Sequence, residues 1–253
     1  MKWHLVDLHV HTALSPCAGA DMDPHGVVTA ALEVGLDAIA ITDHNSALNC
    51  EAVMCQAEPF DLIVWPGLEV ETSEEVHVLC IFSSLEQAKD MSQQIGDTLL
   101  RRRSMARVLG EQLIYDCTNR VVGEEDNMLS TASGYSLEQV VDMTRALGGV
   151  SIPAHIERES FGLLGVLGFV PEGLGVTALE VSGGRNTDAL RRMHAIGESI
   201  ALVTSSDAHH RSEVGRQKTG VYCQRLDLES FRKACRGDDG HRLALVGVRE
   251  GRN

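Results

Sequence analysis

Short apolar segments of the strand type, most of them flanked by a histidine or a carboxylate, constrain the fold of this chain most. These segments cover residues 37–42, 62–65, 76–82, 150–154, 177–181 and 201–205, and helix-like segments separate them. The flanking polar residues are Asp43, His44, Glu69, His77, His155, Asp207 and His209. A charged group beside a core is costly unless it is solvated, paired or coordinated. The strand–helix alternation predicts an α/β fold whose strand ends carry chemistry.

The opening segment, residues 3–11, has strand periodicity, which places Asp7, His9 and His11 on one face. In a (β/α) barrel the strand ends converge on one face, where active sites form. A doubly wound sheet instead gathers ligands mainly at one switch point. Because polar residues follow many different strands, we expect a distorted TIM-like barrel that forms a single domain over residues 1–253.

Three local expectations accompany this fold. The proline and glycine at residues 66–67 should end the strand before Glu69, and residues 84–112 should be helical with a break near Gly96. The stretch 115–134 is rich in Asp, Glu, Asn, Ser and Thr. We expect it to form a polar insertion or lid.

The charge and the cysteine content narrow the range of expected binding partners and cellular compartments. The net charge is −14, which argues against long duplex nucleic acid and anionic membranes as partners. An anionic substrate stays compatible, because local cations can outweigh the global charge. Seven cysteines without regular spacing, and no apolar run of about 18 residues, favour a cytoplasmic protein with mostly free thiols.

Histidines and carboxylates at successive strand ends are typical of metal ligands. Two imidazoles on one strand face, as in His9-x-His11, can hold one ion, and Glu69 has two oxygens that could bridge two ions. Asp7 could orient a ligand histidine or bond to the backbone. Taken singly, each residue also fits a structural role, as a capping Asp or a hydrogen-bonded histidine. Together they predict a metal cluster.

The order of these motifs resembles the PHP (polymerase and histidinol phosphatase) superfamily. The motifs are His9-x-His11, Thr42-Asp43-His44, Gly67-Leu68-Glu69, His77, Pro153-Ala154-His155 and Ser206-Asp207-Ala208-His209. The resemblance runs from residue 5 to about residue 210. It implies a distorted (β/α)7 barrel with a metal cluster at the carboxyl ends of the strands, in an enzyme that hydrolyses phosphate esters.

The resemblance also implies a ligand set for two or three divalent ions. The first ion would be held by His9, His11, Glu69 and Asp207. Glu69 would bridge to a second ion, held also by His77 and His155, and His44 and His209 would face a third. Family members often carry a further His or Asp where this chain has Pro16 and Cys17, so Cys17 is a possible extra ligand.

The chemistry that follows is attack on phosphorus by a metal-activated hydroxide. His, Asp and Glu ligands suit Zn, Mn or Fe. We predict Glu69, Asp207 and His209 as catalytic residues. Arg158 and Arg185 are predicted to bind the substrate phosphate, as arginines do in phosphatases that the chain resembles. The expected substrate is a small phosphomonoester, a nucleotide or a short oligonucleotide.

Two other functions stay open. A non-catalytic PHP domain could act as a scaffold for a partner, although the ligand motifs of this chain are nearly complete. A metal amidohydrolase could also use His-x-His in a barrel. Such enzymes usually add a bridging lysine, whereas Lys89, Lys218 and Lys233 lie away from the strand ends.

Overall fold

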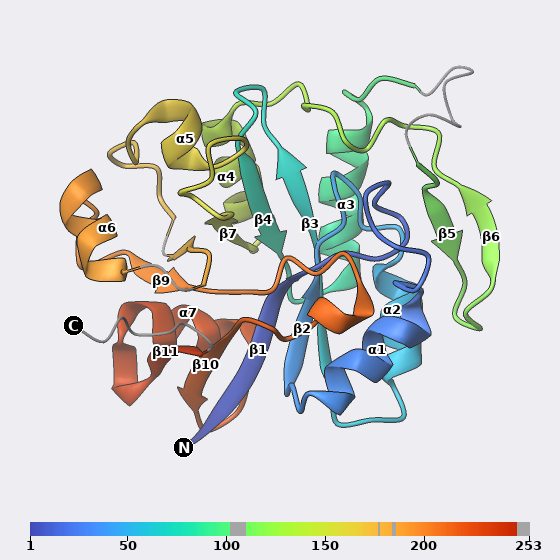
Figure 1. Ribbon diagram of the computed structural model, residues 1–253, viewed down its shortest axis with the longest axis horizontal. Helices are drawn as coiled ribbons and strands as arrows, with labels where there is room; N and C mark the ends of the chain where they lie inside the picture. Colours follow the sequence, from blue (N-terminus) through green and yellow to red (C-terminus); the bar gives the residue numbers. More distant parts are fainter. Residues whose placement is uncertain (102–109, 177, 184–185, 247–253) are drawn as a thin grey trace.

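A curled seven-stranded sheet forms the frame of the computed structural model, which describes residues 1–101, 110–176, 178–183 and 186–246 (Figure 1). Its strands, in spatial order, are β11 (Arg242–Val246), β10 (Lys218–Cys223), β1 (Lys2–Val10), β2 (Ala38–Ile41), β3 (Ile63–Glu71), β4 (His77–Ile81) and β7 (Val150–Pro153). Two smaller pairs are β5 (Leu113–Tyr115) with β6 (Val121–Glu124), and β8 (Ala178–Glu180) with β9 (Ala201–Val203). Because β8 contacts β7 and β9 contacts β11, this last pair bridges the two ends of the curled sheet.

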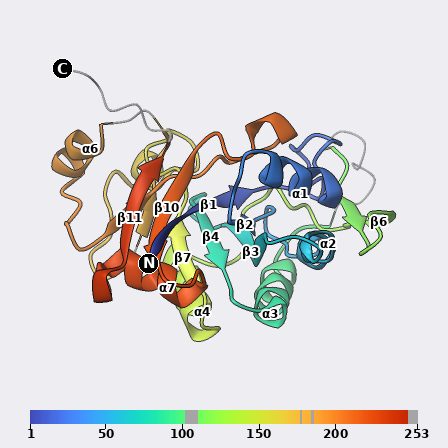
Figure 2. The ribbon, with the colours of Figure 1, turned by 90° about the horizontal axis from the view of Figure 1, so that it is seen from below.

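Helices connect many of the strands in the described part of the chain. They are α1 (Pro24–Glu33), α2 (Cys50–Ala57), α3 (Leu85–Gly96), α4 (Leu137–Ala146), α5 (Leu163–Leu167), α6 (Thr187–His194) and α7 (Leu228–Arg236). Figure 2 shows α1, α2 and α3 along the side of β1 to β3. The side chains of β2 alternate between two hydrophobic clusters. Ile39 and Ile41 belong to the cluster that includes helix residues, and Ala38 and Ala40 pack with Trp65 in the other.

The mixed α/β fold is confirmed, but the strands do not follow a strict (β/α)7 alternation. Strands β1, β2 and β3 are parallel, whereas β4 is antiparallel to both β3 and β7. Strand β10 is likewise antiparallel to β1 and β11. The start of β4 therefore lies at the edge where β3 ends, and His77 pairs with Glu71 there.

Strand β3 continues through Pro66 and Gly67, so the expected stop at these residues is wrong. The first part of the strand pairs with β2 and the second part pairs with β4. A Cβ atom on Gly67 would lie 2.6 Å from the carbonyl oxygen of Cys80, so only glycine allows β4 to approach this closely. Because β3 continues beyond Pro66 and Gly67 and changes its pairing partner there, Glu69 lies within the sheet.

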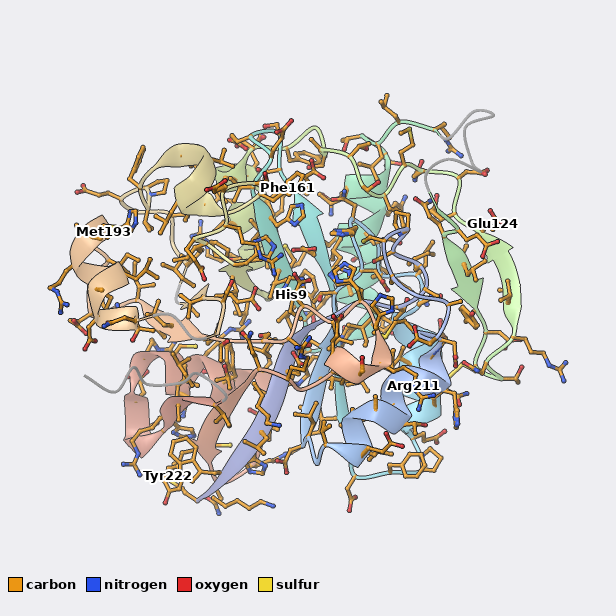
Figure 3. The ribbon with its side chains drawn as sticks, in the orientation of Figure 1. His9, Glu124, Phe161, Met193, Arg211 and Tyr222 are labelled. Carbon is orange, nitrogen blue, oxygen red and sulfur yellow. A yellow bond between two sulfur atoms is a disulfide. The ribbon has the colours of Figure 1, made fainter. Side chains whose placement is uncertain are left out.

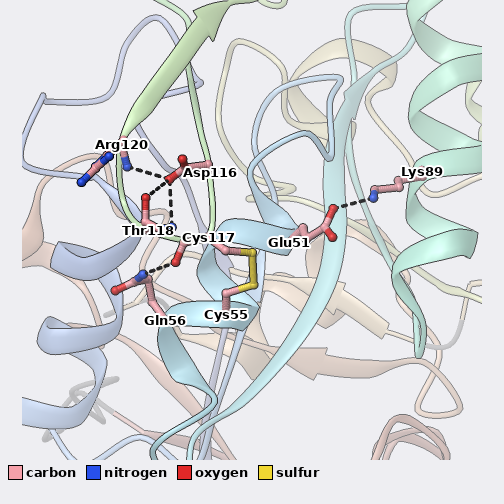
Figure 4. The surroundings of a disulfide bond; sticks show 8 residues. All are labelled: Glu51, Cys55, Gln56, Lys89, Asp116, Cys117, Thr118 and Arg120. Atoms are coloured by element: carbon pink, nitrogen blue, oxygen red, sulfur yellow. Dashed lines mark hydrogen bonds and ion pairs between the residues drawn. A yellow bond between two sulfur atoms is a disulfide. The ribbon is translucent and has the colours of Figure 1, made fainter.

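The expected helix over 84–112 ends at Gly96, and residues 102–109 lie outside the described part of the chain. The segment 115–134 carries most of the β5–β6 hairpin, and Cys117 forms a disulfide with Cys55 of α2 (Figure 4). This bridge was not expected from the sequence. The other five cysteines form no disulfide. Within the described residues, none of the helices has the length and apolar character needed to cross a bilayer.

Candidate metal centre

The structure brings all eight predicted metal ligands to one edge of the curled sheet. They are His9 and His11 from the end of β1, His44 after β2, Glu69 of β3, His77 at the start of β4, His155 after β7, and Asp207 and His209 after β9. Figure 3 shows His9 near the middle of the molecule, with Phe161 above it. The curl of the sheet explains the convergence, since it turns the ends of separate strands towards one point.

Glu69 lies at the centre of this donor cluster, by which we mean the eight residues named above. Its Oε1 lies 2.9 Å from His77 Nδ1, and its Oε2 lies 2.9 Å from His44 Nδ1. The Nε2 atoms of three more histidines approach the same carboxylate, at 3.2 Å for His9, 3.3 Å for His155 and 3.5 Å for His11. Both oxygens of the carboxylate therefore face imidazoles that come from different parts of the sheet.

Asp207 supplies the second inward carboxylate. Its Oδ1 lies 3.2 Å from His9 Nε2 and 3.2 Å from His11 Nε2, and these two nitrogens are themselves 3.2 Å apart. Asp207 has a φ of +53°, which a non-glycine residue rarely adopts. Such backbone strain is common at functional sites. Here it accompanies a carboxylate aimed between two imidazoles.

The electrostatics of the cluster favour ionised carboxylates. Burial alone would raise the pKa of Glu69, but the imidazoles around it, His77 foremost, lower that pKa well below its usual range. Burial opposes ionisation of Asp207 too, but His9 and His11 lower its pKa. Burial lowers the pKa of His11 to about 3, so this imidazole is neutral at pH 7 and carries a lone pair on one of its two ring nitrogens.

The donors fit a divalent cation. Among the described residues, three groups hold their ligand atoms within 4.8 Å of one another: His9, His11 and Glu69; His44, Glu69 and His77; and His11, His44 and His209. Imidazole nitrogens together with carboxylate oxygens suit Zn, Mn or Fe. His11 belongs to two groups but points only one nitrogen inward, because its Nδ1 lies 3.0 Å from Ser15 Oγ. One imidazole nitrogen serves one ion, so the groups compete for His11.

Cys17 lies beside the group that contains His44 and His209. Burial raises the pKa of the Cys17 thiol, but hydrogen bonds with the imidazoles of His209 and His44 outweigh this and lower it to about 6. The thiol is therefore mainly a thiolate at pH 7. Cys17 is exposed, whereas the other free cysteines of the described chain are buried. It remains a possible extra ligand, while His11 supplies a donor to this group that the sequence did not assign to it.

Replacing Cys17 with serine is expected to lower zinc occupancy by up to one ion per chain, because a thiolate favours zinc over manganese. Elemental analysis of the variant and the parent, each loaded with zinc or with manganese, would measure this. Alkylation of Cys17 in the metal-free protein should be half-maximal near pH 6, and zinc should suppress it. If the variant and the parent bind equal amounts of zinc, and zinc does not suppress the alkylation of Cys17, then Cys17 is not a ligand.

Two further carboxylates hold the backbone around the cluster. Asp7 accepts backbone N–H groups of His9, Ser206 and Gly215, at 3.4, 3.0 and 2.8 Å, so it anchors the loop of Asp207 and contacts no imidazole. Burial raises its pKa to about 6.

Asp43 likewise faces away from the donors. It accepts the N–H of Thr12 at 2.7 Å and the hydroxyl of Ser15 at 2.7 Å. Ser15 in turn contacts His11 Nδ1, so Asp43 supports that imidazole indirectly.

Sequence reasoning missed Glu180. This buried residue ends β8, and its Oε2 lies 3.0 Å from His9 Nδ1. A lone carboxylate within the apolar segment 178–181 was a usable signal, because such a group needs a partner. That partner lies 171 positions away, so local patterns could not identify it.

A cavity of about 450 Å³ opens onto the cluster. Its wall includes Arg158, Phe161, Ser130 and Glu71 besides the candidate ligands. Arg158 is half-exposed there, and its Nη1 lies 2.7 Å from Asp207 Oδ2. Arg185 lies outside the described residues. Ser130 lines the cavity from the segment 115–134, and a disulfide ties the hairpin of that segment to α2. The role of the segment as a polar insertion or lid stays a prediction.

A model of the PHP domain matches residues 7–145. No curated protein matches the chain in sequence. The lesion-specific endonuclease PfuEndoQ from Pyrococcus furiosus has a similar solved structure, with a TM-score of 0.70 and 19% identity. The similarity covers 96% of this chain but only 58% of the endonuclease.

Two other solved structures match this chain over nearly their whole lengths. A Bifidobacterium adolescentis protein assigned to the metal-dependent phosphoesterases has a TM-score of 0.59 and 20% identity, over 92% of this chain and 96% of that one. An amidohydrolase from Chromobacterium violaceum with bound sulfate has a TM-score of 0.53 and 17% identity, over 93% of this chain and 99% of that one. At these identities the likeness concerns the fold.

The expectation that excluded long duplex nucleic acid is wrong. A structure of endonuclease Q that matches this chain with a TM-score of 0.70 holds a 27-mer duplex with an abasic lesion at its active site. The physical reason is that net charge describes the whole surface, whereas a duplex meets the local groups around a site. Bound cations can make such a site attractive to phosphate on an acidic protein.

Proposed function

Because this chain belongs to the PHP domain family, we propose that its donor cluster hydrolyses a phosphate ester. Family membership and the related folds identify it as a metal-dependent hydrolase. The observation that carries the proposal is the central carboxylate of Glu69, which lies within 3.5 Å of imidazoles from the end of β1, the start of β4 and the segment after β7. A single carboxylate placed in this way suits two neighbouring cations, which phosphate ester hydrolysis uses to best effect.

Bound cations would supply an activated water and would neutralise charge on the phosphate. The chain supplies the rest. His9, His11, Glu69 and Asp207 would hold one cation, and His77 and His155 would hold a second together with Glu69. His44 and His209 would hold a third. The half-exposed guanidinium of Arg158, beside Asp207 in the cavity, would bind phosphate oxygens with its forked donors.

The proposed substrate is a small phosphomonoester, a nucleotide or a short oligonucleotide. A cavity of about 450 Å³ is of the size that encloses a small organic ligand. Arg158 provides a positive group in its wall that could clamp one phosphate. Asp207 and His209 complete the wall on the side of β9, where we place the catalytic groups together with Glu69.

An activity screen of the cation-loaded protein tests the function. We expect turnover of phosphomonoesters or short phosphodiesters with manganese, zinc or iron, and loss of turnover after chelation. The panel includes amides, long single strands and duplexes with and without an abasic site, so that each alternative has its own substrate. Turnover of amides alone would overturn the proposal, as would inactivity on every phosphate ester with every metal.

An amidohydrolase activity is the second candidate, and the fold of the Chromobacterium violaceum protein favours it. Among the residues that line the cavity in the described structure, none is a lysine that could bridge two ions. Phosphate ester hydrolysis therefore remains the better-supported proposal. A non-catalytic scaffold is the third candidate function. It would leave the nearly complete set of converging donors without a role.

A further inference from the structure

Glu180 is a buried carboxylate that belongs to none of the three donor groups, yet it contacts two candidate ligands. Its Oε2 lies 3.0 Å from His9 Nδ1 and accepts the backbone N–H of His155 at 3.0 Å. A single carboxylate oxygen at the end of β8 thus holds the ligand of β1 and the ligand that follows β7. The proposed hydrolysis does not otherwise use this residue.

The contact places a proton on Nδ1 of His9. A carboxylate accepts hydrogen bonds, so Nδ1 must donate. Nε2 then points the other way, at 3.2 Å from both Glu69 Oε1 and Asp207 Oδ1. A nitrogen coordinates a cation through its lone pair, so a proton fixed on Nδ1 leaves Nε2 as the coordinating atom.

The second contact of Glu180 acts on a strained turn. His155 has a φ of +31°, a conformation that non-glycine residues rarely adopt. The N–H of His155 donates to the Glu180 carboxylate, and the N–H of Ile156 donates to the Glu180 carbonyl at 3.0 Å. These two bonds hold the turn that brings His155 Nε2 within 3.3 Å of Glu69.

We propose that Glu180 is a positioning residue that keeps Nδ1 of His9 protonated, directs Nε2 of His9 into the donor cluster, and thereby raises the affinity of the centre for its cation. This inference rests on the proposed function, because it assumes that the cluster holds a cation. His11 has an analogous but indirect support, since Ser15 stands between its Nδ1 and Asp43. Of the three buried carboxylates around the donor cluster, Asp7, Asp43 and Glu180, it is Glu180 that contacts an imidazole directly.

The test measures zinc affinity by competition with a chromophoric chelator, and the protonation of His9 by ¹⁵N NMR of the imidazole rings. In the parent, Nδ1 of His9 should carry a proton in both the metal-free and the zinc-loaded protein. Glu180→Ala should lower zinc affinity by about 10- to 100-fold. Glu180→Gln should lower it less, because the amide oxygen can still accept the Nδ1 proton.

Asp7→Asn is the matched control. Asp7 is also buried and also lies beside the cluster, but its hydrogen bonds come from backbone N–H groups and the Ser206 side chain, and none comes from an imidazole. This variant should therefore keep the proton of His9 on Nδ1 even if it loses stability. A loss of that proton in Asp7→Asn would mean that general loosening, and not the contact with Glu180, explains the result.

Zinc bound through Nδ1 of His9 in the parent would overturn the proposal, and so would parental zinc affinity in Glu180→Ala. If Glu180→Ala does not fold, the NMR spectrum of the parent still decides. Neither measurement involves turnover. A protein that binds zinc with the expected dependence on Glu180 but hydrolyses no phosphate ester would refute the proposed function and leave this inference standing.

Discussion

Replacing Glu69 with glutamine is expected to lower kcat by about 10³-fold or more, and to lower cation content at two sites together. Removing a carboxylate shared by two cations costs several kcal/mol of charge stabilisation in the transition state, which corresponds to this loss in rate. The structure gives the reason for the coupling, because the Glu69 carboxylate lies within 3.5 Å of the histidines proposed for the first cation and of those proposed for the second. Elemental analysis and steady-state kinetics on one preparation would measure both effects.

Glu71→Gln is the matched control for this experiment. Glu71 lies two positions further along β3 and also lines the cavity, but its carboxylate approaches a histidine no closer than 3.8 Å, at His77 Nε2. We expect a smaller loss of activity and an unchanged cation content. Glu69→Gln with parental cation content would contradict the shared role of this carboxylate. Circular dichroism of both variants would separate this result from a failure to fold.

Replacing Arg158 with alanine is expected to lower kcat/KM for a small phosphate ester by about 10- to 10³-fold. This is the scale of losing a few kcal/mol from a charged contact with phosphate. The guanidinium is half-exposed in the cavity and lies 2.7 Å from Asp207, so it is placed beside the candidate reaction centre. Arg158→Lys should recover part of the loss, because lysine keeps the charge but lacks the planar fork.

Cation content distinguishes the two roles that the Arg158 geometry allows. If the arginine binds substrate, the alanine variant keeps its cations and loses kcat/KM. If it chiefly holds Asp207, cation content falls as well, and the role in phosphate binding is refuted. Arg185 keeps the same prediction on sequence grounds alone, because it lies outside the described residues.

The candidate ligands could be predicted because each one follows a local pattern. His9 and His11 alternate along one strand, and His155 directly follows an apolar segment. Such patterns can be recognised without knowledge of the tertiary fold, because the end of a strand is a local property of the chain. Their convergence could be predicted only through the barrel, and the curled sheet provides it.

The pairing of distant segments could not be predicted in the same way. Glu180 contacts His9 across 171 positions, and Cys55 pairs with Cys117 across 62. The reversed direction of β4 was also missed, because a proline and a glycine that usually end a strand here mark a change of pairing partner. Each of these features depends on which surfaces meet after folding.

The sequence by itself determined the α/β class, the identity of the eight candidate ligands and the PHP motifs that contain them. The α/β class follows from side-chain periodicity, which operates over a few neighbouring positions, whereas the choice of these eight ligands rests on the resemblance to the PHP superfamily. The tertiary structure alone decided how the donors share Glu69, which nitrogen of His9 faces inward, and that His11 is common to two groups. Those outcomes depend on distances of about 3 Å between side-chain atoms that come from different strands. The curl of the sheet and the packing of its two cores set these distances.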